Sequence, residues 1–237
     1  MINVLLTLAG LALTVAAPSR AADGAPSSAS EPAQARNTEA QDEAIQSAAT
    51  TRVADWIAAS GDNSALPYAI IDKNAAALFL FDAKGKPLGK VPVLIGVAVG
   101  DDATPGIGTK NLAEIGPAEK TTPAGRFLAK FGLAAGNQKV LWVDYATSVA
   151  LHPIPKGASK KDRRRQRMLS ATADDNRITF GCINVPMAFY SKSLRPLFQK
   201  KGGYVYVLPD TKPLEAVFPR LLIQAQMNQA QMNHGAP

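Results

Sequence analysis

Short apolar runs separated by turn residues occupy the chain from residue 68 to residue 208. Runs rich in Val, Ile, Leu, Phe and Tyr and bounded by Gly, Pro, Asn or Asp predict strands. Many short strands with few helices predict a mainly β fold, a single sandwich or closed-sheet domain with a few peripheral helices. The predicted strands are Tyr68–Asp72, Ala77–Asp82, Leu88–Gly96, Gly125–Gly132, Val140–Asp144, Val149–His152, Arg177–Phe180 and Tyr204–Leu208.

Helical periodicity is limited to three segments. Apolar positions within 38–56 predict an amphipathic helix that Gly61 ends, and Pro186–Lys200 and Pro213–Gln226 predict two more. The predicted divisions are residues 1–21, a leader; 22–48, a low-complexity linker; 49–66, a helix packing on the domain; 67–210, the β-rich domain; and 211–237, a C-terminal helix and polar tail.

The first segment, Met1–Ala17, is apolar but too short to make a comfortable permanent membrane anchor. Ser19 and Ala21 fit the small-residue positions of a cleavage site after Ala21, so a secretory signal peptide is predicted, with an uncleaved anchor as the alternative. No later stretch is apolar for long enough to span a bilayer, so no stable membrane insertion is expected after cleavage. With a single cysteine the chain has no internal disulfide, and its fold must depend on a hydrophobic core.

The positive charge is concentrated in one segment. Lys156–Arg167 holds seven Lys or Arg against one Asp, which accounts for +6 of the formal charge of +7. The rest of the chain is nearly neutral, which argues against a broad nucleic-acid-binding surface. The segment itself is interpreted either as a solvated loop or as a patch for an acidic envelope polymer. Nucleic acid is disfavoured because the run contains no interleaved aromatic residues.

Cys182, the only cysteine, follows a short β run and lies thirty residues after His152. A thiol with a histidine available as a base is the minimum for nucleophilic catalysis, although a buried structural cysteine is the alternative. Gly181 allows a close backbone approach, and amides near Cys182 are candidate oxyanion donors. Thr179 and Asn184 are candidates for fixing the turn by hydrogen bonds. No cluster of ligands in the sequence suggests a metal or another cofactor.

These residues resemble the catalytic motif of the L,D-transpeptidase (YkuD-type) family: a His, a spacer, then Ser or Thr, His, Gly, Cys, a hydrophobic residue and Asn. His152 and the run Thr179–Asn184 match it in order. The segment Ile71–Asp82 is similar to the opening strand pair of that domain, and Thr121–Phe127 to its Thr-Pro-x-Gly-x-Phe element. The resemblance extends from Tyr68 to about Leu208.

The resemblance implies a β-rich enzyme exported to the periplasm or cell envelope that acts on peptidoglycan stem peptides without a cofactor. Cys182 would attack the carbonyl between the third residue and D-Ala of a tetrapeptide, and His152 would move the proton. The thioester would pass to an amine, which makes a cross-link, or to water, which makes the protein an L,D-carboxypeptidase. Acylation by carbapenem-type β-lactams is also implied.

Two features depart from the family pattern. Phe180 stands where the family usually has a histidine, and it motivates an alternative: a catalytically weak module that binds peptidoglycan. The spacer between His152 and Cys182 is longer than usual by about a dozen residues, a length that surface loops tolerate. Because the excess coincides with the basic run, we expect a flap beside the cleft. Its Arg163, Arg164 and Arg165 are candidate substrate contacts, as is Arg177.

Overall fold

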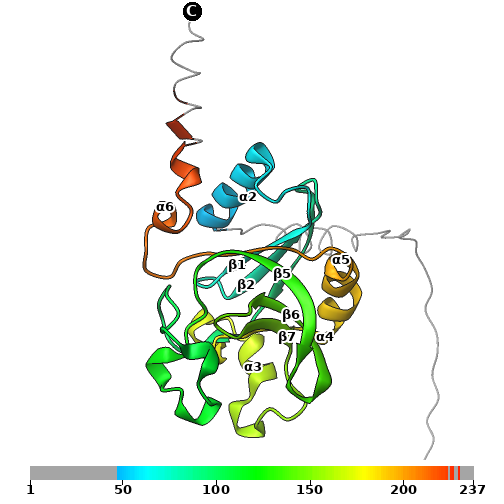
Figure 1. Ribbon diagram of the computed structural model, residues 1–237, viewed down its shortest axis with the longest axis vertical. Coiled ribbons are helices and arrows are strands. Elements are labelled where there is room, and N and C mark those ends of the chain that lie inside the picture. The colour runs from blue at the N-terminus through cyan, green and yellow to red at the C-terminus, as the bar shows by residue number, and fades with distance from the viewer. Residues whose placement is uncertain (1–46, 224, 227–228, 230–237) are drawn as a thin grey trace, which may run out of the picture. The chain divides into compact units, whose positions relative to one another are not determined.

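The computed structural model describes residues 47–223, 225, 226 and 229 (Figure 1). The predicted leader and nearly all of the linker lie outside them. The mainly β prediction is confirmed: an eight-stranded sheet has the order β3-β2-β1-β10-β5-β6-β7-β9, and β4 and β8 form a second, two-stranded sheet. The strands are β1 Tyr68–Asp72, β2 Ala77–Phe81, β3 Pro87–Pro92, β4 Ile95–Gly96, β5 Gly125–Ala134, β6 Gln138–Asp144, β7 Val149–Pro153, β8 Arg177–Thr179, β9 Ile183–Val185 and β10 Gly203–Val207.

The two ends of the large sheet are connected through Leu94 and Asn184. Leu94 follows β3, which is one end strand, and Asn184 is the middle residue of β9, which is the other. Each donates its backbone N–H to the other's carbonyl oxygen, at 2.9 Å in both directions. The pair closes the sheet and leaves the middle of β9 bonded on both sides, to β7 and to Leu94.

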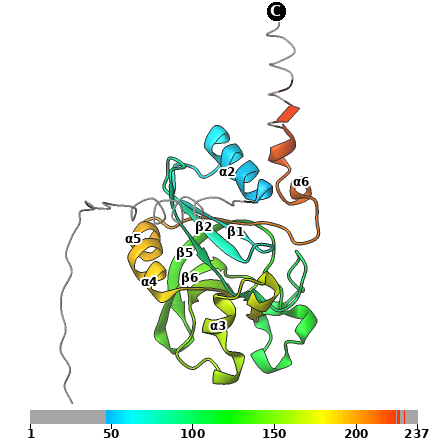
Figure 2. The same cartoon turned by 180° about the vertical axis from the view of Figure 1, so that it is seen from behind.

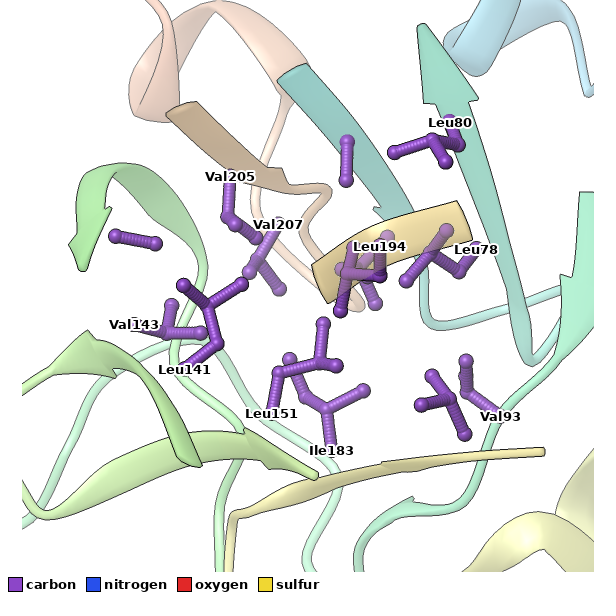
Figure 3. Close-up of a cluster of buried hydrophobic side chains, with 14 of the residues drawn as sticks. Leu78, Leu80, Val93, Leu141, Val143, Leu151, Ile183, Leu194, Val205 and Val207 are labelled. Atoms are coloured by element: carbon purple, nitrogen blue, oxygen red, sulfur yellow. The ribbon is translucent and has the colours of Figure 1, made fainter. Parts of the chain in front are cut away.

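Strands β1 and β2 are buried along their whole length, because both of their faces are covered. One face contributes to the core inside the closed sheet, where Leu78, Leu80, Leu141, Leu151 and Val205 meet (Figure 3). The other face packs against α2 (Ala48–Ser60) and the α6 region (Leu214–Val217), which lie on the same side of these strands (Figures 1 and 2). Because both faces are buried, the sequences of these strands are nearly continuous apolar runs and do not alternate between apolar and polar residues.

Local sequence sets the ends of the helices. Ser47 caps α2 by accepting a hydrogen bond from the Thr50 N–H, and Gly61 ends the helix in the left-handed conformation. The predicted helix 186–200 forms as α4 (Met187–Phe189), a π turn (η7, Tyr190–Leu194) and α5 (Arg195–Phe198). Its irregularity has a covalent cause, because Pro196 has no N–H to donate to the preceding turn.

Proline also explains two boundaries that were predicted wrongly. The expected strand 88–96 is two strands: β3 ends at Pro92, and β4 joins β8 in the small sheet. The expected helix 213–226 begins at Leu214 and is interrupted at Phe218, whose φ of −122° and ψ of 73° lie outside the helical region that a following proline disfavours. The short helical turns are η1 Ile107–Thr109, η2 Leu112–Glu114, η3 Pro117–Glu119, η4 Ala135–Asn137, η5 Lys160–Asp162, η6 Ala173–Asn176 and α3 Arg164–Met168. Within the described ranges, no helix has the length and apolar character needed to cross a membrane.

A buried ionic network ties together segments that are far apart in the sequence. The Lys73 ammonium contacts Asp101 Oδ1 at 3.0 Å and Asp210 Oδ2 at 3.3 Å, and the lysine and both acids have side chains only 1% exposed. Arg177, the first residue of β8, reaches Asp210 Oδ1 at 2.8 Å. Burial by itself raises the pKa of Asp101, but hydrogen bonds from the backbone of 210, 212 and 211 and from Lys73 outweigh burial and hold that pKa well below its ordinary value of 3.8.

Replacing Lys73 with methionine should destabilise the fold, because it leaves two buried carboxylates facing one remaining cation. We expect the free energy of unfolding to fall by about 3–5 kcal/mol, measured by urea denaturation. Because the pKa of Asp101 is lower in the folded state, its charged form stabilises the fold fully at pH values above its unfolded-state pKa. This stabilisation is lost as the pH falls through the folded-state pKa.

The matched control is Lys84→Met, which removes the same charge from an exposed turn position and should change stability by less than about 0.5 kcal/mol. Equal urea midpoints for Lys73→Met and the wild-type protein would contradict a stabilising role for the network.

Candidate functional site

His152 and Cys182 are brought together by neighbouring parallel strands. In the β7–β9 pair, His152 is opposite Asn184, and Cys182 is two residues before Asn184, immediately ahead of β9. Because side chains two residues apart in an extended chain share a face, this register places the thiol and the imidazole on the same side of the strand pair. The backbone of Ala150 in β7 also bonds to Cys182.

The His152 ring is oriented by its own strand. Its Nδ1 lies 2.7 Å from the carbonyl oxygen of Pro153, to which it donates as N–H, so the lone pair of the neutral ring is on Nε2. Burial lowers the pKa of His152, the Pro153 contact partly opposes that shift, and the positive charge of Arg164 lowers the pKa further. The imidazole is therefore neutral at neutral pH and able to accept a proton.

The Cys182 thiol is partly exposed, and its Sγ lies 3.6 Å from the carbonyl oxygen of Ser148, which accepts a weak hydrogen bond from it. Burial raises the pKa of Cys182, while the backbone of Ala150 and the charge of Arg164 offset part of that rise. With the pKa of the thiol raised and the pKa of the imidazole lowered, the resting pair is a neutral thiol beside a neutral imidazole. At neutral pH, formation of the thiolate would therefore need a base to take the proton, and His152 is the candidate.

The turn before Cys182 is fixed by close backbone packing. Gly181 has a φ of 120°, and a Cβ placed on it would lie 2.6 Å from the carbonyl oxygen of Thr121. The hydroxyl of Thr179 donates to the Cys182 carbonyl oxygen at 2.6 Å and accepts the Gly181 N–H at 3.2 Å. The Gly181 amide is therefore already engaged and is not a free oxyanion donor. Thr122, which belongs to the Thr121–Phe127 element but was not among the predicted site residues, donates its hydroxyl to the Gly181 carbonyl oxygen at 2.9 Å.

The structure separates the three neighbouring arginines of the basic segment. Arg163 and Arg165 are exposed, whereas the Arg164 side chain is only 14% exposed. Arg164 donates from Nη1 to Asn184 Oδ1 and from Nε to Asp162 Oδ2, at 3.1 Å each. The left-handed conformation of Arg163, with a φ of 47°, joins η5 to α3 at this point. One cation of the run thus reaches the site.

The remaining predicted residues have distinct surroundings. Asn184 is fully buried, and its Nδ2 has no hydrogen-bond partner within the described part of the chain. Phe180 is exposed, and the Lys120 ammonium lies over its ring. Arg177 bonds to Asp210, in the ionic network, instead of pointing a free guanidinium toward a substrate. Among residues 47–223, 225, 226 and 229, no group of His, Cys, Asp or Glu forms a candidate metal site.

Comparison with known proteins finds no matching family model and no matching curated protein. Among solved structures, an L,D-transpeptidase from Xylanimonas cellulosilytica matches with a TM-score of 0.36 and 14% identity, over 60% of this chain and 60% of that chain. The catalytic domain of an L,D-transpeptidase from E. faecium matches with a TM-score of 0.34 and 17% identity, over 60% of this chain and 96% of that one.

A third structure, the helical cell shape determining protein Pgp2 from Campylobacter jejuni, matches with a TM-score of 0.41 and 13% identity, over 78% of this chain and 65% of that one. The first two structures carry the name of the family that the sequence motif resembles.

The opposed pKa shifts predict how Cys182 responds to pH. Because its pKa is raised, little thiolate is present at neutral pH, and the rate of alkylation by iodoacetamide should still be rising with pH where an ordinary cysteine has levelled off. Intact-mass measurement of alkylation across pH checks this. A rate already on its plateau at neutral pH would show a thiolate at rest and contradict the neutral pair.

Arg164 supplies a matched test of the same site. Arg164→Gln removes a charge that lowers the pKa of Cys182, so the alkylation profile should move to higher pH and the rate at pH 7.5 should fall about two- to ten-fold. Arg165→Gln removes the same charge from an exposed neighbour and should leave the profile unchanged. Equal shifts in both variants would indicate only a general effect of net charge.

Proposed function

We propose that this protein is a cysteine-dependent L,D-transpeptidase that acts on peptidoglycan stem peptides. The observation that carries the proposal is the β7–β9 register, which brings His152, with its tautomer fixed by Pro153, to the face that carries Cys182. The substrate class comes from the order of His152 and Thr179–Asn184 in the chain, which resembles the L,D-transpeptidase motif. A nucleophile and a base held on rigid strands suit acyl transfer.

In the proposed reaction, His152 Nε2 takes the thiol proton as Cys182 Sγ attacks the carbonyl carbon between the third stem residue and D-Ala. The tetrahedral intermediate collapses with cleavage of the C–N bond, and the proton on His152 passes to the leaving amine of D-Ala. A thioester remains on Cys182. An amine from a second stem then attacks the thioester and gives a proton to His152; the new amide forms as the C–S bond breaks, and His152 returns the proton to the sulfur, which restores the thiol.

Arg164 is proposed to stabilise the negative charge that develops in this sequence. Its guanidinium uses one donor on Asn184 and one on Asp162, and among the described residues no further partner takes the remaining donors of its planar fork, which leaves them to a carboxylate or an oxyanion. Arg163 and Arg165, being exposed, are better placed to attract an acidic envelope polymer at a distance. Polymer binding by Lys156–Arg167 remains a prediction.

The decisive experiment incubates the full chain without its leader, and its Cys182→Ala variant, with disaccharide tetrapeptide and measures product masses. We expect a cross-linked dimer and released D-Ala with the wild-type protein, and a loss of at least about a thousand-fold in Cys182→Ala. Release of D-Ala without a dimer would assign water as the acceptor and make the protein an L,D-carboxypeptidase. Equal products from both variants would contradict the proposal.

A carbapenem separates an enzyme from a module that only binds peptidoglycan. A covalent adduct on Cys182, seen by intact mass and absent from Cys182→Ala, supports acyl chemistry. Alkylation of Cys182 by iodoacetamide without any carbapenem adduct favours the binding module, since it shows an accessible thiol that does not attack an acyl donor.

Action on peptidoglycan requires export, and we propose that residues 1–21 direct the chain to the periplasm or cell envelope. The soluble periplasmic fraction of cells expressing the full sequence should contain a protein whose N-terminus, determined by mass spectrometry, is Ala22. Recovery of the uncleaved chain from the membrane fraction would instead support an N-terminal anchor.

A further inference from the structure

An exposed aromatic ring carries a cation next to the turn that precedes Cys182. Phe180 is 39% exposed, and the Lys120 ammonium nitrogen lies 3.9 Å from the centroid of its ring. This is well inside the range at which a cation is attracted to an aromatic face. The ring therefore gives the end of a long and flexible side chain a preferred position.

The charge on Lys120 is not neutralised by an acid in the part of the chain that the structure describes. No carboxylate there forms an ion pair with it; the adjacent Glu119 bonds instead to the Lys110 ammonium through Oε1 and to the Gly116 N–H through Oε2. A ring face accepts no conventional hydrogen bond, so the donors of the Lys120 ammonium remain available to an anion.

The backbone of Lys120 is packed against the segment that holds the nucleophile. Its carbonyl oxygen accepts the Ala98 N–H at 3.1 Å. The next residue, Thr121, presents its carbonyl oxygen to Gly181 so closely that a Cβ there would clash, and Thr122 bonds to the Gly181 carbonyl oxygen. These contacts fix the backbone of Lys120, from which its side chain extends, relative to Cys182.

We propose that Lys120, positioned by the Phe180 ring, forms a carboxylate-binding subsite beside Cys182. The ammonium would pair with the carboxylate, and the apolar ring would exclude water from one side of the pair, which strengthens the attraction. The ligand class is an acyl substrate with a carboxylate close to the carbonyl that is attacked. The identification of this substrate as a stem peptide rests on the proposed function, whereas anion binding next to the thiol is independent of it.

Two small alkylating reagents test the subsite without any acyl chemistry. Iodoacetate carries a carboxylate and iodoacetamide is its neutral analogue, and both transfer a carbon to Cys182 Sγ with loss of iodide. In Lys120→Met, the ratio of the iodoacetate rate to the iodoacetamide rate should fall about three- to ten-fold, while the iodoacetamide rate stays close to that of the wild-type protein.

Control variants separate a local effect from a general one. Lys86→Met removes the same charge from the exposed turn between β2 and β3 and should keep the wild-type ratio, whereas Lys120→Arg, which retains the cation, should retain most of it. An unchanged ratio in Lys120→Met, or an equal fall with both reagents, would overturn the subsite.

The role of the ring is tested separately by Phe180→Leu, which keeps an apolar side chain but removes the aromatic face. The ratio should fall toward that of Lys120→Met; a wild-type ratio would overturn the positioning by Phe180. Because alkylation needs only an accessible Cys182, the result is independent of tetrapeptide turnover, so failure of the subsite and failure of the proposed function are distinguishable.

Discussion

Two backbone hydrogen bonds between Leu94 and Asn184 are the constraint on which the rest of the site depends. Without them β9 would have a free edge just beyond Cys182, and a three-residue strand with one free edge is easily displaced. With them, the residues after Cys182 are held from both sides, by β7 and by the segment after β3. The turn before Cys182 is also held, because the Thr121 carbonyl oxygen packs closely against Gly181 and the Thr122 hydroxyl bonds to the Gly181 carbonyl oxygen. The thiol is therefore fixed from both directions along the chain, which suits a nucleophile that must meet a substrate carbonyl without rearrangement.

Burial favours the neutral forms of Cys182 and His152, so charge would develop on them during the proposed reaction and not at rest. It raises the pKa of Cys182 and lowers that of His152, and both shifts oppose a resting ion pair. A tenfold change in an acid dissociation constant corresponds to about 1.4 kcal/mol of preference between the two protonation states. Arg164 lowers both pKa values, so it favours the thiolate while disfavouring the imidazolium. In the proposed reaction, the net contribution of Arg164 would therefore be greatest once negative charge has moved from sulfur to the attacked carbonyl, where a fixed cation needs no reorganisation.

The sequence predicted the mainly β fold better than it predicted the contacts around Cys182. Strand-type runs and the order of His152 and Cys182 were enough to predict a β domain and the motif, because both are local patterns. The strand β9 was not predicted, since its three residues, Ile183–Val185, are too few to carry a periodic signal. Within the run of arginines nothing distinguishes Arg164 from its exposed neighbours, because burial there is decided by the left-handed residue at 163 and by contact with Asn184. Lys120 gave no signal at all: its proximity to Phe180 depends on packing between segments sixty residues apart.

The position of Arg177 shows why a basic residue near a nucleophile is not by itself a substrate contact. Arg177 begins β8 and bonds to Asp210, while Thr179 ends β8 and holds the Cys182 carbonyl oxygen. The strand is thus secured at both ends, by a buried ion pair and by a hydroxyl, and the guanidinium that sequence reasoning assigned to substrate stabilises the scaffold. Desolvated charges of this kind persist only where partners compensate them, as Lys73, Asp101 and Asp210 do for one another. In the described part of the chain, two cations next to the segment 180–184 have partners that leave donors available: Arg164, which contacts Asn184, and Lys120, which lies over Phe180.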